Sequence, residues 1–129
     1  MVIPPLDRRR LRATADEGWE LIGARCRSCR HTMHPVRPVC PRCGHGCEIV
    51  RLHPAGTVVA ATVVRATRPD VLLRPPFGVV AVVLADGPVL TLPVAGSDRP
   101  TPGDRVDVEP FEVGDGDARW RALQARVAS

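Results

Sequence analysis

Five cysteines lie within 22 consecutive residues, and their spacing is that of a metal site. They are Cys26, Cys29, Cys40, Cys43 and Cys47. The first four form two Cys-x-x-Cys pairs separated by ten residues, and each pair can place two thiolates on one ion. Two such pairs complete a tetrahedral four-cysteine site. An odd number of clustered cysteines, behind a charged N-terminus with no export signal, argues against a disulfide framework.

A site closed by four thiolates indicates a structural metal. It leaves no coordination position for water, so zinc-dependent hydrolysis is disfavoured. Residues 40–44 read Cys-Pro-Arg-Cys-Gly, a pattern that also occurs in rubredoxin, where iron transfers electrons. A tetrahedral all-sulfur site suits both metals. We predict a structural Zn2+ held by Cys26, Cys29, Cys40 and Cys43, with a redox iron as the alternative.

The fifth cysteine and the nearby histidines are predicted to stay outside this site. We expect Cys47 to be a free thiol that enters the next strand, with a role as substitute ligand as the alternative. Four histidines surround the cluster: His31, His34, His45 and His53. They could act as ligands or as hydrogen-bond donors to ligands. Because four cysteines already fill the site, we interpret them as ordinary polar loop residues.

The chain is predicted to have three segments, and the second of them contains the cysteine cluster. Residues 1–17 have no sustained helical periodicity and are predicted to be an arm, in which Asp7 could cap a short helical turn through Leu11 and Arg12. Residues 18–47 are predicted to be a zinc ribbon, with a strand at Trp19–Cys26 that leads into the cluster. Prolines disfavour regular structure within the cluster itself. Residues 48–129 are predicted to be a barrel.

The predicted barrel segment is rich in short apolar strands. We expect strands at 48–52, 57–64, 78–85, 89–94, 105–111 and 119–127, separated by Pro- and Gly-containing turns such as Asp86-Gly87. Five or six strands with short connections and almost no helix favour a small closed Greek-key barrel over a two-sheet sandwich. The predicted fold class is therefore all-β.

Composition excludes several functions. All 18 basic residues are arginine, and lysine and tyrosine are absent, which excludes a lysine Schiff base, a P-loop lysine and a tyrosine acid. The chain has no catalytic motif, so we expect a protein that is not an enzyme. Its longest charge-free apolar stretches are too short to span a membrane as a helix. We expect a soluble, cytoplasmic protein.

The charge is uneven along the chain. Residues 1–51 carry ten arginines and five acidic residues, whereas residues 52–129 carry eight and nine. Arginines around the long loop at 67–76 could hold the phosphates of coenzyme A or of a nucleic acid, because a guanidinium binds phosphate through two hydrogen bonds. They are Arg65, Arg68 and Arg74. The simpler interpretation, which we favour, is that they are solvated charges or partner contacts.

The order of five motifs resembles a known family. The motifs are LIGARC at 21–26, PVRPVCPRCG at 35–44, GTVVAATVV at 56–64, PPFGVVAVV at 75–83 and PGDRV at 102–106. From about Trp19 to Val127, the chain is similar to bacterial and archaeal acyl-CoA-associated proteins long known as a domain of unknown function. The resemblance implies an N-terminal rubredoxin-like zinc ribbon followed by a small Greek-key OB-fold barrel.

The resemblance also implies a function. Members of this family look like non-catalytic accessory subunits of thiolase-fold enzymes or hot-dog-fold enoyl-CoA hydratases in lipid, steroid or polyketide metabolism, and they are thought to help present acyl-CoA. The candidate ligand or partner contacts here are Arg68, Arg74 and Phe77. The chain departs from the family at Arg30, where a glycine is usual, and in its N-terminal arm, where many members carry a helix.

Two other functions remain as alternatives. Zinc ribbons and OB-fold barrels also bind single-stranded nucleic acid, and the fold alone does not decide between functions. The chain has four aromatic residues and a nearly neutral barrel segment, both of which disfavour nucleic-acid binding. The other alternative is a rubredoxin-like iron electron carrier.

Overall fold

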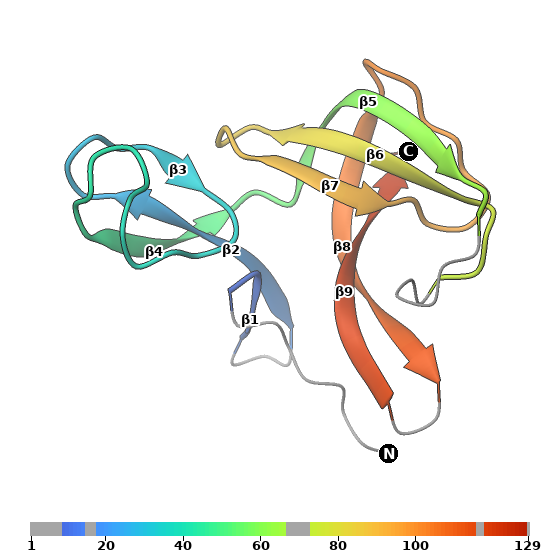
Figure 1. Cartoon of the computed structure of the whole chain (residues 1–129), viewed down its shortest axis with the longest axis horizontal. Helices are drawn as coiled ribbons and strands as arrows, with labels where there is room; N and C mark the ends of the chain where they lie inside the picture. Colours follow the sequence, from blue (N-terminus) through green and yellow to red (C-terminus); the bar gives the residue numbers. More distant parts are fainter. Residues whose placement is uncertain (1–8, 15–17, 67–72, 116–117, 129) are drawn as a thin grey trace.

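The fold was analysed in a computed structural model, which describes residues 9–14, 18–66, 73–115 and 118–128. Over these residues the chain forms nine strands and no helix, so the predicted all-β class is confirmed (Figure 1). No helix long and apolar enough to cross a membrane occurs among them. The strands belong to two sheets, one near the N-terminus and one that curves into a barrel.

The first sheet is built around one central strand. Its members are β1 (Leu11–Ala13), β2 (Trp19–Cys26), β3 (Thr32–Met33) and β4 (Cys47–Leu52). The central strand β2 pairs with β1 and β3 along one edge and with β4 along the other, and all three pairings are antiparallel. The β2–β4 register runs from Leu21 opposite Leu52 to Cys26 opposite Cys47.

Two expectations for this sheet were wrong. The predicted helical turn through Leu11 and Arg12 is the strand β1, because the register places Leu11 beside Leu21, where its side chain is 2% exposed. The strand expected at 48–52 forms, but as β4 it pairs with β2 in the first sheet and not with the barrel. The division into segments 1–17, 18–47 and 48–129 itself stays a prediction.

The second sheet has the predicted barrel topology. It contains β5 (Ala55–Val64), β6 (Phe77–Leu84), β7 (Val89–Pro93), β8 (Arg105–Asp115) and β9 (Ala118–Val127), in the order β7-β6-β5-β8-β9. A parallel bridge between Val94 and Ala125 brings the two ends of this order together. The result is a nearly closed five-stranded barrel with the Greek-key order of an OB fold.

Local sequence explains the barrel strands. Burial alternates along β6, with Val80, Val82 and Leu84 inside, as expected for apolar strands with one buried face. The predicted Asp86-Gly87 turn joins β6 to β7, and Gly87 adopts the positive φ of 111° that favours glycine. Gly56 on β5 also has to be a glycine, because an added Cβ would lie 2.3 Å from the carbonyl oxygen of Val83.

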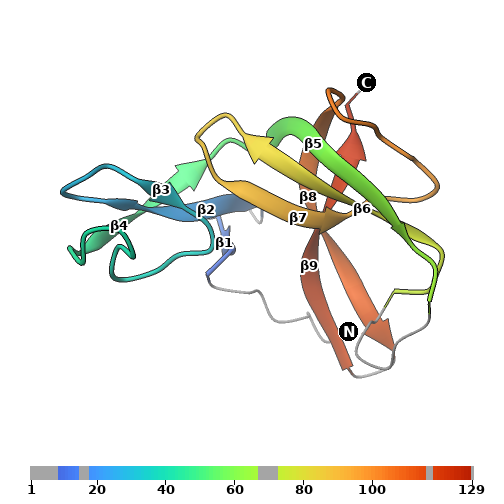
Figure 2. The ribbon, with the colours of Figure 1, turned by 45° about the horizontal axis from the view of Figure 1, so that its top comes forward.

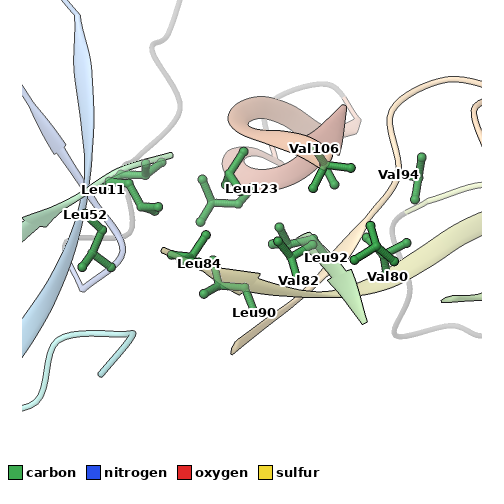
Figure 3. Close-up of a cluster of buried hydrophobic side chains, with 14 residues drawn as sticks. Leu11, Leu52, Val80, Val82, Leu84, Leu90, Leu92, Val94, Val106 and Leu123 are labelled. Atoms are coloured by element: carbon green, nitrogen blue, oxygen red, sulfur yellow. The ribbon is translucent and has the colours of Figure 1, made fainter. Parts of the chain in front are cut away.

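The two sheets share one hydrophobic core. Leu11, Leu21 and Leu52 of the first sheet belong to the same cluster of 14 buried residues as the inward side chains of the barrel. Figure 3 shows Leu11 and Leu52 on one side of this cluster, with barrel residues such as Leu84 and Leu123 beyond them. The first sheet and the barrel therefore pack as one unit, with the first sheet lying beyond the β6–β7 turn (Figure 2).

Candidate metal centre

The four predicted ligand cysteines lie together at the outer end of the first sheet. Their Sγ atoms are all within 4.8 Å of one another, with 3.3 Å between Cys26 and Cys43 and 3.7 Å between Cys29 and Cys40. A zinc–sulfur bond of about 2.3 Å in a tetrahedron places sulfur atoms about 3.8 Å apart. The distances and the all-thiol donor set therefore fit one tetrahedral metal ion.

The two Cys-x-x-Cys pairs fold in the same way. The N–H of Cys26 donates to the carbonyl of His31, and the N–H of Cys40 donates to the carbonyl of His45, both over 2.9 Å. In each case the chain turns back on itself within five residues. This shared turn explains why a spacing pattern alone could locate the site.

A second bond in each turn sets an unusual backbone conformation. The N–H of Arg30 donates to the carbonyl of Cys26, and the N–H of Gly44 donates to that of Cys40. Both residues have a left-handed φ, 67° for Arg30 and 77° for Gly44. Glycine adopts this conformation freely, whereas arginine does so at a cost. The departure noted at Arg30 is therefore a strained position in an otherwise repeated turn.

Burial divides the four cysteines into two classes. Cys26 and Cys40 are almost fully buried, in a small cluster with Ala24 and Met33. Cys29 and Cys43 are exposed. Each turn thus contributes one inner and one outer thiol.

The thiols are electrostatically coupled. The backbone N–H of Cys29 donates to Cys26 Sγ over 3.4 Å and lowers the pKa of Cys26 to about 6, although burial opposes this. The backbone N–H of His45 favours the thiolate of Cys43, but the adjacent Cys26 and burial together raise the pKa of Cys43 to about 12. Two thiolates this close repel each other, so only a cation allows all four to be ionised.

Cys47 and the histidines lie outside the four-sulfur group. Cys47 is half-buried, and burial raises its pKa. It enters the strand after the cluster, as expected, but that strand is β4 of the first sheet and not a barrel strand. The Nδ1 atom of His34 lies 2.9 Å from the carbonyl oxygen of Ile22. Among the described residues the metal-binding group contains the four cysteines alone.

The predicted loop contacts are only partly visible. Arg68 lies outside the described residues. Arg74 is exposed, and Phe77 is half-buried at the start of β6.

A hollow of about 250 Å³ lies between the start of β2 and the β8–β9 hairpin, away from this loop. Its lining residues are Gly18, Trp19, Pro110, Phe111, Glu112 and Arg121. Sequence reasoning missed it, because Gly18 and Trp19 meet the β8–β9 residues only through the packing of the two sheets.

Fold and site together define a class of protein, a four-cysteine ribbon packed on an OB-fold barrel. Residues 20–46 match the family described as the ChsH2 rubredoxin-like zinc ribbon domain. A chain of the solved "Ltp2-ChsH2(DUF35) aldolase" has a TM-score of 0.68 and 25% sequence identity, and the match covers 85% of this chain and 86% of that chain. No curated protein matches the sequence.

The family match and the structural match agree on the ribbon. One covers the metal ribbon, and the other extends over most of the barrel as well. The chain is thus similar to a DUF35 protein and has the same two parts, a rubredoxin-like zinc ribbon and an OB-fold barrel. The resemblance inferred from the five sequence motifs is confirmed.

Proposed function

We propose that this chain is a non-catalytic accessory subunit of an acyl-CoA-processing enzyme in lipid, steroid or polyketide metabolism. The observation that carries the proposal is the likeness over 85% of this chain to a chain of the Ltp2-ChsH2(DUF35) aldolase, at 25% identity. The partner would be a thiolase-fold enzyme or a hot-dog-fold hydratase, as the family resemblance implies.

The metal site supports a structural role within such a subunit. Cys26, Cys29, Cys40 and Cys43 would hold a zinc ion, which supplies a cross-link between the two turns. The small cluster around Ala24 and Met33 buries too little apolar surface to hold this end of the sheet by itself. Four thiolate ligands leave no position for a reacting water, which supports a non-catalytic role.

The acyl-CoA contact is a separate part of the proposal. Arg68 and Arg74, with the adjacent Phe77, would contact the ligand or the partner at the loop before β6. An exposed guanidinium such as that of Arg74 suits a phosphate group, and the half-buried ring of Phe77 could pack against an adenine or an acyl chain.

Affinity purification of the tagged chain from its native cells, followed by mass spectrometry, tests the accessory role. We expect one thiolase-like or hydratase-like enzyme in stoichiometric yield. Recovery of RNA-associated proteins, or of nothing above background, would contradict the proposal. The recovered enzyme is then assayed alone and with this chain, and we expect the chain to add activity or stability without being active by itself.

The ligand contact is tested on the same complex. Replacing Arg74 with Ala and Phe77 with Ala should weaken acyl-CoA binding by the complex while the two proteins still co-purify. Arg105→Ala on β8 is the matched control, because Arg105 is also exposed but pairs with Thr57, at the end of β5 opposite to the loop. Unchanged acyl-CoA affinity would remove these residues from the proposal and leave the accessory role intact.

A further inference from the structure

The metal-bearing part of the chain carries most of the excess positive charge of the described structure. Residues 18–52 contain six arginines and two glutamates. The arginines are Arg25, Arg27, Arg30, Arg37, Arg42 and Arg51. Residues 53–129, which include the barrel, contain eight arginines and nine acidic residues and are nearly neutral. The charge asymmetry predicted between the two parts of the chain therefore coincides with the boundary between the first sheet and the barrel.

Three of these arginines are exposed and have no ionic partner among the described residues. They are Arg27, Arg37 and Arg42. Arg30 and Arg51 lie 3.9 Å from Glu48 and 3.8 Å from Glu20, so their charges are only loosely balanced. Exposed pairs of this kind contribute little to stability, and folding alone does not explain so many arginines here.

Backbone contacts bring the segments that carry them together. The N–H of Arg27 donates to the carbonyl of Gly46 over 3.1 Å, and Gly46 forms an antiparallel bridge with Val39. The N–H of Cys47 donates to the carbonyl of Pro38 over 3.0 Å, so the segment after Arg37 lies alongside the start of β4. Arg42 lies in the second cysteine turn, whose thiols meet those of the first.

Exposed apolar side chains lie in the same segments. Val39 is 53% exposed and Ile49 is 54% exposed, although both are aliphatic. Val39 pairs with Gly46, and Ile49 follows Cys47 by two residues on the same face of β4. We call the set Arg27, Arg37, Val39, Arg42 and Ile49 the ribbon surface. In Figure 1 this part of the molecule projects away from the barrel.

We propose that the ribbon surface is the docking site for an acidic surface on the partner enzyme. This inference rests on the proposed accessory function and names the part of the chain that makes the contact. Arginine and exposed aliphatic side chains together are typical of protein interfaces, where aliphatic groups form the dry centre and arginines pair with carboxylates around it. Unpaired positive charge also speeds encounter with a surface of opposite charge.

The metal site leaves this charge pattern in place. Four thiolates and one divalent cation carry a net charge of −2. The six arginines and two glutamates of residues 18–52 carry a net charge of +4, so the ribbon stays positive with the metal bound.

The same surface fits a nucleic acid less well. Single-stranded binding uses aromatic side chains as stacking platforms. Trp19 is the one aromatic residue in 18–52, and it is only partly exposed and packs against the barrel core. Val39 and Ile49 offer no stacking surface. These exposed aliphatic side chains are explained by a protein partner and not by a phosphate backbone.

The test uses the enzyme that co-purifies with the wild-type chain. Its affinity for the purified wild-type chain and for Arg27→Glu with Arg42→Glu is measured by titration calorimetry. We expect the double variant to bind about tenfold more weakly, or worse, and to lose most of the salt dependence of the wild type. Arg99→Glu with Arg105→Glu is the matched control, because it makes the same change in net charge at exposed barrel positions.

Two measurements separate docking from folding. Because Arg27 and Arg42 lie within the cysteine turns, the metal content and thermal unfolding of each variant are recorded. A second variant, Arg37→Glu with Ile49→Ser, changes the ribbon surface outside the turns. We expect it to retain its metal and to bind several-fold more weakly.

The outcomes distinguish the docking site from the accessory function. Equal affinity for the wild type and both ribbon variants, or an equal loss in the barrel control, overturns this inference and leaves the accessory function standing. The absence of any co-purifying enzyme overturns both. A fluorescent single-stranded RNA that binds the wild type tightly and loses binding in the ribbon variants would assign the ribbon surface to nucleic acid instead.

Discussion

The two cores of this protein are held together by different chemistry. The barrel core joins 14 buried residues, all of them Leu, Val or Ala, from both sheets. The ribbon cluster contains Ala24, Met33 and the thiols of Cys26 and Cys40. The first is stabilised by burial of apolar area, whereas the second has half of its members committed to a metal site. A metal ion thus takes the place of a hydrophobic core where the chain is too short and proline-rich to build one.

The pair of strands β2 and β4 takes part in both cores. Leu21 and Leu52 are paired on β2 and β4, and both side chains lie in the barrel core. Ala24 and Cys26 are on the alternate face of β2 and lie in the ribbon cluster. The comparison therefore predicts that damage to either core destabilises the other through this strand pair, but weakly.

The largest effect is expected from loss of the metal. Structural zinc contributes about 10–16 kcal/mol of apparent binding free energy in isolated zinc-finger peptides. Removing the ion with a chelator, or replacing Cys26 and Cys40 with Ser, should abolish hydrogen-exchange protection in β3 and in the outer half of β2 while β6 stays protected. Hydrogen exchange by mass spectrometry measures this. A folded double variant with unchanged metal content would refute the proposed site.

The identity of the metal is measured on the same preparation. Elemental analysis of the purified chain should give one zinc per chain and a colourless protein. A red preparation with stoichiometric iron would support the rubredoxin-like electron carrier and contradict the proposed structural zinc.

A cavity in the barrel core should have the next largest effect. Leu84→Ala removes a side chain that is 1% exposed, and it should lower the free energy of unfolding by about 2–5 kcal/mol. The variant should still bind one metal ion, because Leu84 is far along the chain from the cysteines and lies in the other core. Chemical denaturation with a parallel metal assay tests both statements. Loss of the metal would mean that the two cores fold as one.

Acid should weaken the ribbon and its metal site. The pKa of Cys26 is about 6, below the ordinary thiol value of 9, so the unfolded chain holds more protons than the folded chain between these values. Stability from this group is full above about pH 9 and is lost as the pH falls through about 6. Metal binding also releases protons from thiols and weakens in the same direction. Zinc competition titrations at decreasing pH should show falling affinity, with Cys47→Ser as the control that leaves the trend unchanged.

The smallest effect is expected at Arg30. A left-handed conformation costs a non-glycine residue about 1–2 kcal/mol, part of which is offset by the greater freedom of glycine in the unfolded chain. Arg30→Gly should therefore raise the stability of the ribbon by about 0.5–1 kcal/mol. The loose pair with Glu48 is too exposed to reverse the sign. Arg27→Gly is the control, because the φ of Arg27 is not left-handed, and it should be neutral or slightly destabilising.

Sequence reasoning located the metal site because its signal is local. Two Cys-x-x-Cys turns are short and fold alike, so the spacing of Cys26 to Cys43 already specifies the geometry. Strand positions were predicted for the same reason, since alternation along β6 and the Asp86-Gly87 turn are read from neighbouring residues. The five-strand barrel followed from the number of strands and the shortness of their connections.

The partners of two strands could not be predicted from the sequence. The sequence of residues 47–52 would also suit a barrel strand. Only their pairing with β2, from Leu52 opposite Leu21 to Cys47 opposite Cys26, assigns them to the first sheet. Leu11 sits in a charged segment and is a strand residue because Leu21 and the barrel core bury it. Both errors concern long-range pairing, which local propensity does not determine. The roles of Arg68, Arg74 and Phe77 stay predictions.

The shared β2–β4 strand pair limits how such a protein can be recombined. A cut between residues 47 and 48, where the sequence becomes rich in apolar strands, would separate most of β4 from β2 and break five consecutive pairings. A cut after Leu52 would keep the strand pair but uncover three leucines that now lie against the barrel: Leu11, Leu21 and Leu52. The ribbon and the barrel are thus stabilised by different chemistry but pack as one unit. A chimera that exchanges only one of them should therefore lose stability.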